Sequence, residues 1–398
     1  MLGLQSLDLL RHRAAVGFRY RSPLLKREMP GLDALRGLAV LGVVLNHGMY
    51  ADQWQIPPTH SLAAHIGKLL RLGWLGVFLF FVLSGFLITG ILLDSKDHPN
   101  YWHNFYLRRV LRIMPAFALV LLILKFFFGS TWAYVAVCLA YLANIAPMMS
   151  LGGALYEPLW SLAVEEQFYL VWPWMARFLT LRRFAYVTLA CILVSPILRF
   201  LSAKGAVTLG NPHRMTWLLA DSLAMGALLA ILLRSRWGSV ERVQLIAWAM
   251  FGVGSALFLA GIPLGILNGQ GLLGAAFETV PFELVFAALI LFSLHVGDLK
   301  AVLIWTRPLR FLGYISYGLY LYHRLVFMSV DGVLKSFAYF KTWSTAEWAL
   351  RFFGEVSLSV LAAYLSRRYF EEFFLALKAR LTPSRSRRVP MARQSAVR

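Results

Sequence analysis

Long apolar stretches recur along the chain, separated by short segments that are rich in Lys and Arg. A helix that crosses the hydrocarbon core of a bilayer needs roughly 20 mostly apolar residues. By that measure the sequence predicts an all-α polytopic membrane protein with about ten transmembrane helices. The predicted spans are residues 32–50, 73–93, 111–128, 158–178, 184–203, 215–233, 243–261, 277–296, 311–330 and 348–366.

An eleventh apolar stretch, residues 131–150, follows the third span after only two residues and contains Asn144 and Pro147. The positions of the basic residues indicate whether it crosses, because cytoplasmic loops carry an excess of Lys and Arg. If it does not cross and the N-terminus is cytoplasmic, most of the 39 Lys and Arg residues fall on the inner side. A full crossing would invert every later loop and remove this bias. The sequence therefore predicts a re-entrant or outer-face helix here, with both termini cytoplasmic.

This arrangement divides the chain into three parts. Residues 1–31 form a basic cytoplasmic segment, residues 32–366 the membrane domain, and residues 367–398 a basic cytoplasmic tail. The tail after Glu372 contains only basic charges, so we expect it to be disordered and attracted to anionic lipid. The first span is not expected to be a cleaved signal peptide, because Arg36 and His47 interrupt it and no small-residue cleavage site follows.

Composition supports the membrane assignment. Apolar residues make up 59% of the chain and charged residues 15%, against about 25% in typical soluble domains. The net charge of +20 could indicate nucleic-acid binding, but its placement in predicted inner loops favours a topological role. Cys138 and Cys191 lie in apolar runs, so no disulfide framework is indicated. No zinc-ligand spacing or nucleotide-binding loop is present, and we expect neither a metal nor a permanently bound cofactor.

Basic residues lie near the predicted inner ends of two spans. Arg36 is about one turn into the first span, while Arg109 and Arg112 are three residues apart and share a helix face. Guanidinium groups bind phosphate in a bidentate manner, so this cluster is a candidate site for a nucleotide-bearing co-substrate. The alternative is simple positive-inside anchoring, which we favour for Arg108 alone.

Acid–base groups form a second layer, nearer the outer side. His47 follows Arg36 by eleven residues, which places both on one helix stripe with a rise of roughly 16.5 Å. A His with carboxylates at similar depth suits a general base and an orienting acid, and Glu165 is the first choice for that acid. Buried ion pairs that only fix helix packing are the alternative. Further acid–base or acceptor-binding candidates are Trp160, Ser161, Glu166, Asp221, Glu278, Glu283 and His323.

Small residues in two apolar segments favour close helix contacts. Ser84 and Gly85 lie in FFVLSGFLITG, and Gly318 lies in SYGLYLYH. A nucleophilic role for Ser84 is disfavoured, because the sequence around it matches no known serine-nucleophile motif.

Six segments together resemble the acyltransferase-3 family of integral membrane acyltransferases, which modify cell-surface glycans and some secondary metabolites. They are LDALRGLAVLGVVLNHG, FFVLSGFLITG, FYLRRVLRIMPAF, LWSLAVEEQFYLVWP, DSLAMGALLA and FLGYISYGLYLYH. The resemblance extends from residue 32 to residue 323 and therefore covers nearly the whole membrane domain.

The resemblance implies ten spans and transfer of an acyl group, usually acetyl, from cytoplasmic acyl-CoA to a hydroxyl. Family motif residues correspond to Arg36 and His47, to Arg109 and Arg112, and to Glu165. The implied acceptor is a glycan, a lipid-linked sugar or another hydroxyl compound at the outer side of a bacterial inner membrane. Many relatives carry an additional extracytoplasmic esterase-like domain, and we expect this chain to act without one.

Three functions remain open at this stage, of which the weakest is an assembly or scaffold protein of the envelope. The first is the membrane acyltransferase, with acyl-CoA at the inner arginines and His47 as the base. The second is a proton-coupled transporter, since intramembrane His and carboxylate groups also mark proton pathways. No internal repeat is visible in the sequence, although repeats are frequent in transporters.

Overall fold

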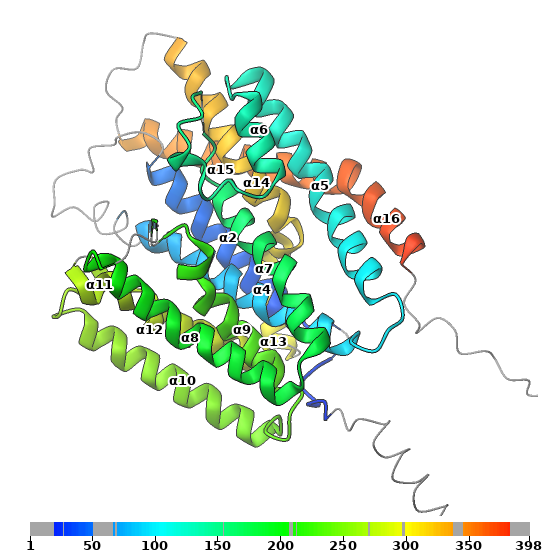
Figure 1. The fold of residues 1–398 in the computed structure, drawn as a ribbon. Helices are drawn as coiled ribbons and strands as arrows, with labels where there is room; N and C mark the ends of the chain where they lie inside the picture. The colour runs from blue at the N-terminus through cyan, green and yellow to red at the C-terminus, as the bar shows by residue number, and fades with distance from the viewer. Residues whose placement is uncertain are drawn as a thin grey trace, which may run out of the picture.

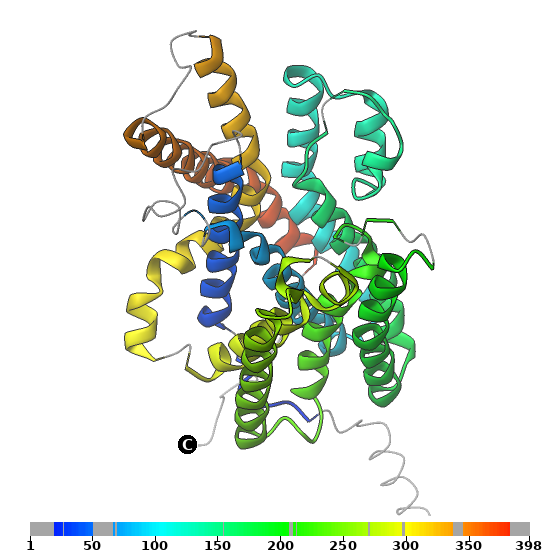
Figure 2. The ribbon, with the colours of Figure 1, turned by 90° about the vertical axis from the view of Figure 1, so that its left-hand side faces the viewer.

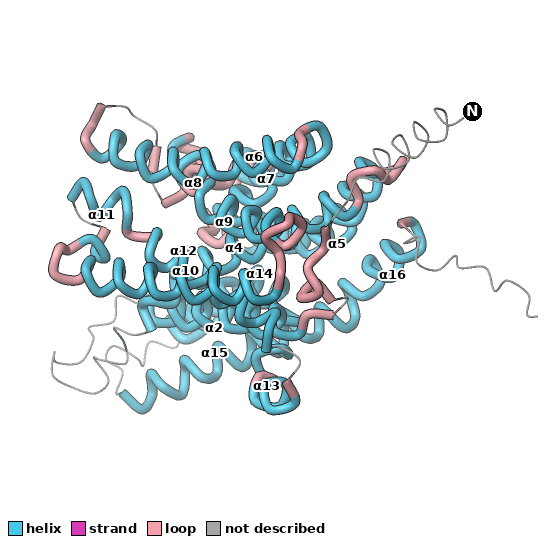
Figure 3. The backbone as a smooth tube through the Cα atoms, turned by 90° about the horizontal axis from the view of Figure 1, so that it is seen from below, coloured by secondary structure: helices cyan, strands magenta, loops and turns pink. Residues whose placement is uncertain are grey.

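The computed structural model is mainly helical, with short loops between the helices, and no strand occurs among the residues that it describes (Figure 3). The described residues are 20–26, 28–50, 67, 70–153, 155–206, 210–211, 213–269, 271–296, 299–336 and 345–382. The expected ends of the basic N-terminal segment and of the basic tail lie outside this range.

The long helices correspond to the predicted apolar stretches, and short helices and turns connect them (Figure 1). The helices are α2 (Pro30–Tyr50), α4 (Leu75–Asp94), α5 (Tyr101–Phe127), α6 (Trp132–Leu139), α7 (Leu159–Phe178), α8 (Leu181–Ala203), α9 (Ala220–Leu232), α10 (Val240–Gly261), α11 (Gly271–Phe277), α12 (Val280–Val296), α13 (Lys300–Trp305), α14 (Arg307–Ser336), α15 (Thr345–Leu365) and α16 (Glu372–Leu381). Four short 3₁₀ helices, Leu72–Trp74, Ala146–Met148, Thr216–Leu218 and Ile266–Asn268, lie between them.

Six of the described helical segments are long and apolar enough to cross a membrane, which supports a multi-pass membrane protein. They contain α4, α5, α8, α10, α11 with α12, and α15. The other predicted spans correspond to α2, α7, α9 and α14. Of these, α9 has only 13 residues, whereas α2, α7 and α14 carry the charged groups predicted to be functional. Charge lowers the apolar character of these three helices, whereas α5 is apolar enough although it carries Arg109 and Arg112.

The centre of the bundle is held together by helix pairs with close backbone contact. α2 packs along α14, and α4 packs along α9. A Cβ added to Gly85 would lie 1.8 Å from the carbonyl oxygen of Leu223, and one added to Gly226 would lie 1.8 Å from that of Val82. These two glycines therefore let α4 and α9 touch through their backbones, which confirms the expectation for Gly85.

The segment predicted not to cross forms a short helical excursion. α6 has eight residues, which span about 12 Å and cannot cross a hydrocarbon core of about 30 Å. The chain reverses at Tyr141, which adopts a left-handed φ of 55°. Figure 2 shows this segment running back beside the end of α5.

The start of the C-terminal tail differs from the expectation of disorder. Residues Ser366–Glu371 form a π-helical segment, and α16 continues to Leu381 and packs on α5. Arg108 fixes the end of α16 by donating to the side chain and carbonyl oxygen of Thr382, at 2.8 and 2.7 Å. The expectation of disorder for this segment was based on its basic charges alone and did not consider the aromatic side chains between them.

Candidate active site

Two cavities contain most of the predicted site residues. One encloses about 390 Å³ and is lined by His47, Trp160, Glu278 and Tyr320 among others; we call it the histidine cavity. The other encloses about 230 Å³; we call it the arginine cavity. It is lined on its polar side by Arg36, Ser84, Arg109, Arg112, Ser161, Glu165, Tyr169, Ser316, Tyr317 and Tyr320.

His47 contacts a second histidine from a distant helix. His47 Nδ1 on α2 lies 2.7 Å from Nε2 of His323 on α14, and the two rings are stacked with centroids 5.0 Å apart. His323 is completely buried, whereas His47 is half-buried and lines the histidine cavity. The packing of α2 along α14 brings these residues together.

The backbone determines how the protons of this pair are arranged. His323 Nδ1 lies 3.0 Å from the carbonyl oxygen of Leu319, which can only accept, so Nδ1 of a neutral His323 carries the hydrogen. Its Nε2 then accepts from Nδ1–H of His47. This assignment leaves Nε2 of a neutral His47 with a free lone pair, as a general base requires.

The polar side of the arginine cavity is organised around an aromatic ring. The guanidinium of Arg109 lies 3.4 Å from the centroid of the Tyr169 ring, and its Nη2 is 3.8 Å from Glu166 Oε1. The Tyr169 hydroxyl donates to Glu165 Oε2 at 3.1 Å and also contacts Ser84. These contacts hold Arg109 in place beside the space that Arg36 and Arg112 also line.

Glu165 therefore does not contact His47, contrary to the role first chosen for it. It lies four residues before Tyr169 on the same face of α7, and that face is turned toward the arginine cavity. The side chain that contacts His47 is instead His323, which was predicted only as a further candidate. His323 also pairs with no carboxylate in the described contacts.

Tyr320 lies between the two cavities and, among the described residues, is the one that lines both of them. Its hydroxyl hydrogen-bonds to Ser161, and its ring lies against Phe80 and near the ring of His323. Ser161 lines the arginine cavity together with Glu165 and contacts Tyr320 at its boundary with the histidine cavity.

Asp221 and Glu283 lie in a separate buried network and line neither cavity. Both oxygens of Asp221 accept from Arg199, at 3.1 and 2.6 Å. Arg199, Asp221 and Glu283 are all almost fully buried. Ser222 donates to Glu283 at 2.6 Å. These contacts connect α8, α9 and α12. The group therefore matches the alternative prediction, buried ion pairs that stabilise helix packing.

Sequence reasoning missed three residues of the histidine cavity, namely Glu157, His213 and Arg214. They lie in loops, where no helical periodicity assigns them to a face. Arg214 Nη2 pairs with Glu157 Oε1 at 3.0 Å. Burial lowers the pKa of His213, and Arg199 and Arg214 lower it further, so His213 is neutral at pH 7.

Within the described residues, no cluster of three or more His, Cys, Asp or Glu side chains could hold a metal ion.

Comparison with known proteins identifies the family of the chain. Residues 29–368 match the acyltransferase-3 family model, which is described as an acyltransferase domain, and the chain belongs to this family. It is 27% identical over 389 residues to a protein named O-acetyltransferase OatA from Staphylococcus aureus (strain NCTC 8325 / PS 47). It is 26% identical over 390 residues to a protein of strain MSSA476 named "Putative O-acetyltransferase".

Both alignments include 87% of this chain but only 57% of the relative. The chain therefore spans little more than half the length of these curated relatives. No solved structure matches it.

Proposed function

We propose that the protein is an integral membrane O-acyltransferase. It moves an acyl group, acetyl in the first instance, from cytoplasmic acyl-CoA to a hydroxyl of a glycan or glycolipid at the outer side of the plasma membrane. The observation that carries this proposal is the meeting of two unlike cavities at Tyr320, one with three arginines and one with a histidine base. The names of the relatives support an acetyl group as the one transferred.

The arginine cavity suits the donor. Arg36, Arg109 and Arg112 supply guanidinium groups that can bind the phosphates of coenzyme A. Apolar side chains, including Leu83, Leu87 and Ile88, line the same cavity and suit the uncharged pantetheine arm. In this arrangement the thioester points toward Tyr320 and His47.

The histidine cavity suits the acceptor. His47 would take the proton of the attacking hydroxyl on Nε2 while the hydroxyl oxygen bonds to the thioester carbonyl carbon. The carbon–sulfur bond then breaks, and the proton passes from His47 to the departing thiolate. Trp160 and Glu278 are in position to hold the acceptor, through ring contact and hydrogen bonding respectively.

Transfer of label tests the proposal. Purified protein is incubated with acetyl-CoA labelled in the acetyl group and with glycan extracted from the bacterial envelope. We expect alkali-labile label on the glycan, lost in His47→Ala and retained in His103→Ala, since His103 is exposed on α5. Movement of a solute without acetyl-CoA, and no labelled glycan, would instead support the proton-coupled transporter.

A further inference from the structure

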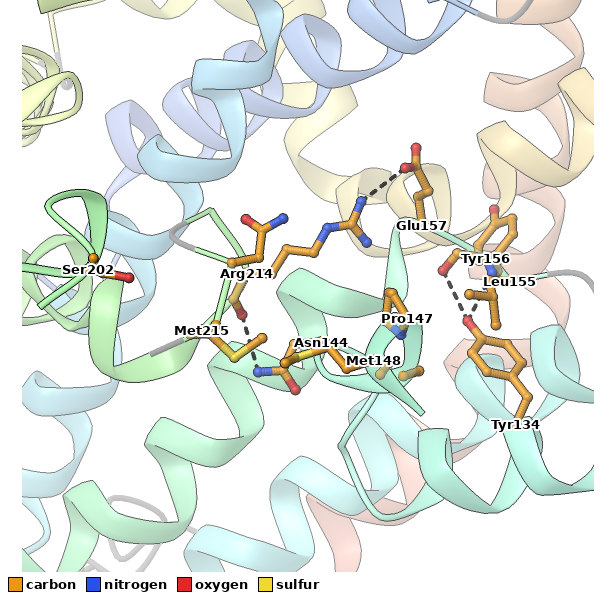
Figure 4. A pocket seen from close by; sticks show the side chains of 15 residues that line it. Tyr134, Asn144, Pro147, Met148, Leu155, Tyr156, Glu157, Ser202, Arg214 and Met215 are labelled. Atoms are coloured by element: carbon orange, nitrogen blue, oxygen red, sulfur yellow. Dashed lines mark hydrogen bonds and ion pairs between the residues drawn. The ribbon is translucent and has the colours of Figure 1, made fainter. Parts of the chain in front are cut away.

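A third cavity, of about 660 Å³, lies beside the histidine cavity and is larger than either of the other two (Figure 4). We call it the outer cavity. The described residues that line it lie between positions 134 and 157 and between positions 202 and 215. They include Asn144, Met148, Leu155, Glu157, Arg214 and Met215.

The outer cavity and the histidine cavity share one polar boundary. Glu157 and Arg214 line both cavities, and they face each other across the ion pair drawn in Figure 4. Their side chains are 56% and 26% exposed, and ion pairs exposed to this extent contribute little to stability. A ligand that offers hydroxyl groups can therefore replace part of this contact at small cost.

Hydrogen bonds keep the walls of the outer cavity in place. Asn144 donates to the carbonyl oxygen of Arg214 at 3.2 Å, and Gln167 donates to Asn144 Oδ1 at 3.0 Å (Figure 4 shows the first). The Tyr134 hydroxyl donates to the carbonyl oxygen of Tyr156 at 3.2 Å. The cavity is therefore preformed, as most small-ligand sites are.

The chemistry of the lining favours an uncharged polyol. The acid Glu157 and the base Arg214 compensate each other, so the boundary has no net charge to attract an anion. A carboxylate accepts from hydroxyls, and a guanidinium donates to them. Met148, Leu155 and Met215 supply apolar surface, which suits the C–H face of a sugar ring.

We propose that the outer cavity is a second sugar subsite. It holds an uncharged sugar residue next to the residue that is acylated at His47, and Glu157 and Arg214 hold hydroxyls at the junction. The inference rests on the proposed acyl transfer and adds that the acceptor extends over at least two sugar residues. Binding of a remote sugar residue can raise kcat/KM when it positions the reacting one.

Acceptor length and a matched pair of variants test this subsite. The probes are an uncharged monosaccharide and an uncharged trisaccharide, both obtained from the glycan that the wild-type protein acetylates. Met148 and Met149 are neighbours, 63% and 44% exposed, but only Met148 lines the outer cavity. Substitution by Trp at Met148 therefore fills the cavity, while the same substitution at Met149 is the control.

We expect wild type and Met149→Trp to prefer the trisaccharide by about tenfold in kcat/KM. Met148→Trp and Arg214→Ala should reduce that preference to within about twofold. An equal kcat/KM for both probes in wild type would overturn the subsite and leave acyl transfer standing. So would an equal loss on both probes in Met148→Trp, because filling a second subsite should spare the one-residue probe. If wild type transfers no label to any glycan, the proposed function fails and the subsite fails with it.

Discussion

His47 Nδ1 and His323 Nε2 lie 2.7 Å apart with their ring planes 8° from parallel, although 276 positions separate the two residues. The carbonyl oxygen of Leu319 fixes the hydrogen on the far side of His323. The hydrogen bond to His323 thus orients the ring of His47, the proposed base. Among the described residues, no carboxylate hydrogen-bonds to either ring, in contrast to a triad in which an acid holds the histidine.

The first prediction concerns this pair. His47→Ala should lower kcat for acetyl transfer by about 10²–10⁴-fold, the usual contribution of general-base catalysis. His323→Ala should lower it less, and the double variant should be no slower than His47→Ala, because His323 acts only through His47. Rates per folded molecule, with His103→Ala as the control, check this. Additive losses would contradict the proposed coupling.

The second prediction concerns the donor. Arg109→Ala and Arg112→Ala should each weaken acyl-CoA binding by roughly ten- to hundredfold, since a hydrogen bond to a charged group contributes about 1.5–3 kcal/mol. Lys at either position should restore binding only in part, because the bidentate geometry is lost. Equilibrium binding measures the effect, with the exposed Arg182→Ala as the control. Unchanged affinity in both Ala variants would leave these arginines as topological anchors.

The third prediction concerns helix contact. Gly85→Ala should reduce the yield and melting temperature of the protein, because the new methyl group would meet the backbone of α9 at Leu223. Gly252→Ala is the control, since nothing lies within 4 Å of its added Cβ and alanine favours a helix. Thermal unfolding in detergent compares the two. Equal stability would show that α4 and α9 can separate without cost.

The fourth prediction concerns the buried network. Asp221→Ala should destabilise the protein by about 3–5 kcal/mol, because it leaves the buried Arg199 guanidinium uncompensated. The pair substitution Arg199→Met with Asp221→Leu should recover much of this loss. In the folded fraction, acetyl transfer should stay near the wild-type rate. A loss of activity without a loss of stability would return Asp221 to the active site.

The fifth prediction concerns topology. In a background without the two native cysteines, Asp97→Cys and Arg236→Cys should be protected from an impermeant thiol reagent added outside intact cells. Lys204→Cys should react. All three positions are exposed in connecting segments, so access to the reagent depends on the side of the membrane. Reaction at 97 or 236 would invert the predicted arrangement of the loops.

Local patterns in the sequence were sufficient to predict the helices and the grouping of the three arginines. Arg36, Arg109 and Arg112 lie at the inner ends of two predicted spans, so membrane topology alone brings them to one level. Helical spacing also placed Arg36 and His47 on one stripe of α2. In the structure, these two residues line the two different cavities.

The partners across helices could not be predicted in the same way. Helical spacing gives the residues that share a face but not the helix that this face contacts, so Glu165 was assigned to His47 when it faces Tyr169. Arg199 was not among the predicted site residues, and its partner, Asp221, lies 22 positions away on another helix. Glu157 and Arg214 lie in loops and gave no periodic signal.

The position of Tyr320 has a consequence for the cell as well as for the reaction. A bacterial membrane stores energy as a proton gradient, and an open aqueous path through a protein would discharge it. Among the described residues, the arginine cavity and the histidine cavity share only Tyr320, which is hydrogen-bonded to Ser161. In the proposed transfer, the acyl group would cross at this side chain, which separates the two cavities and keeps them from forming one open aqueous path.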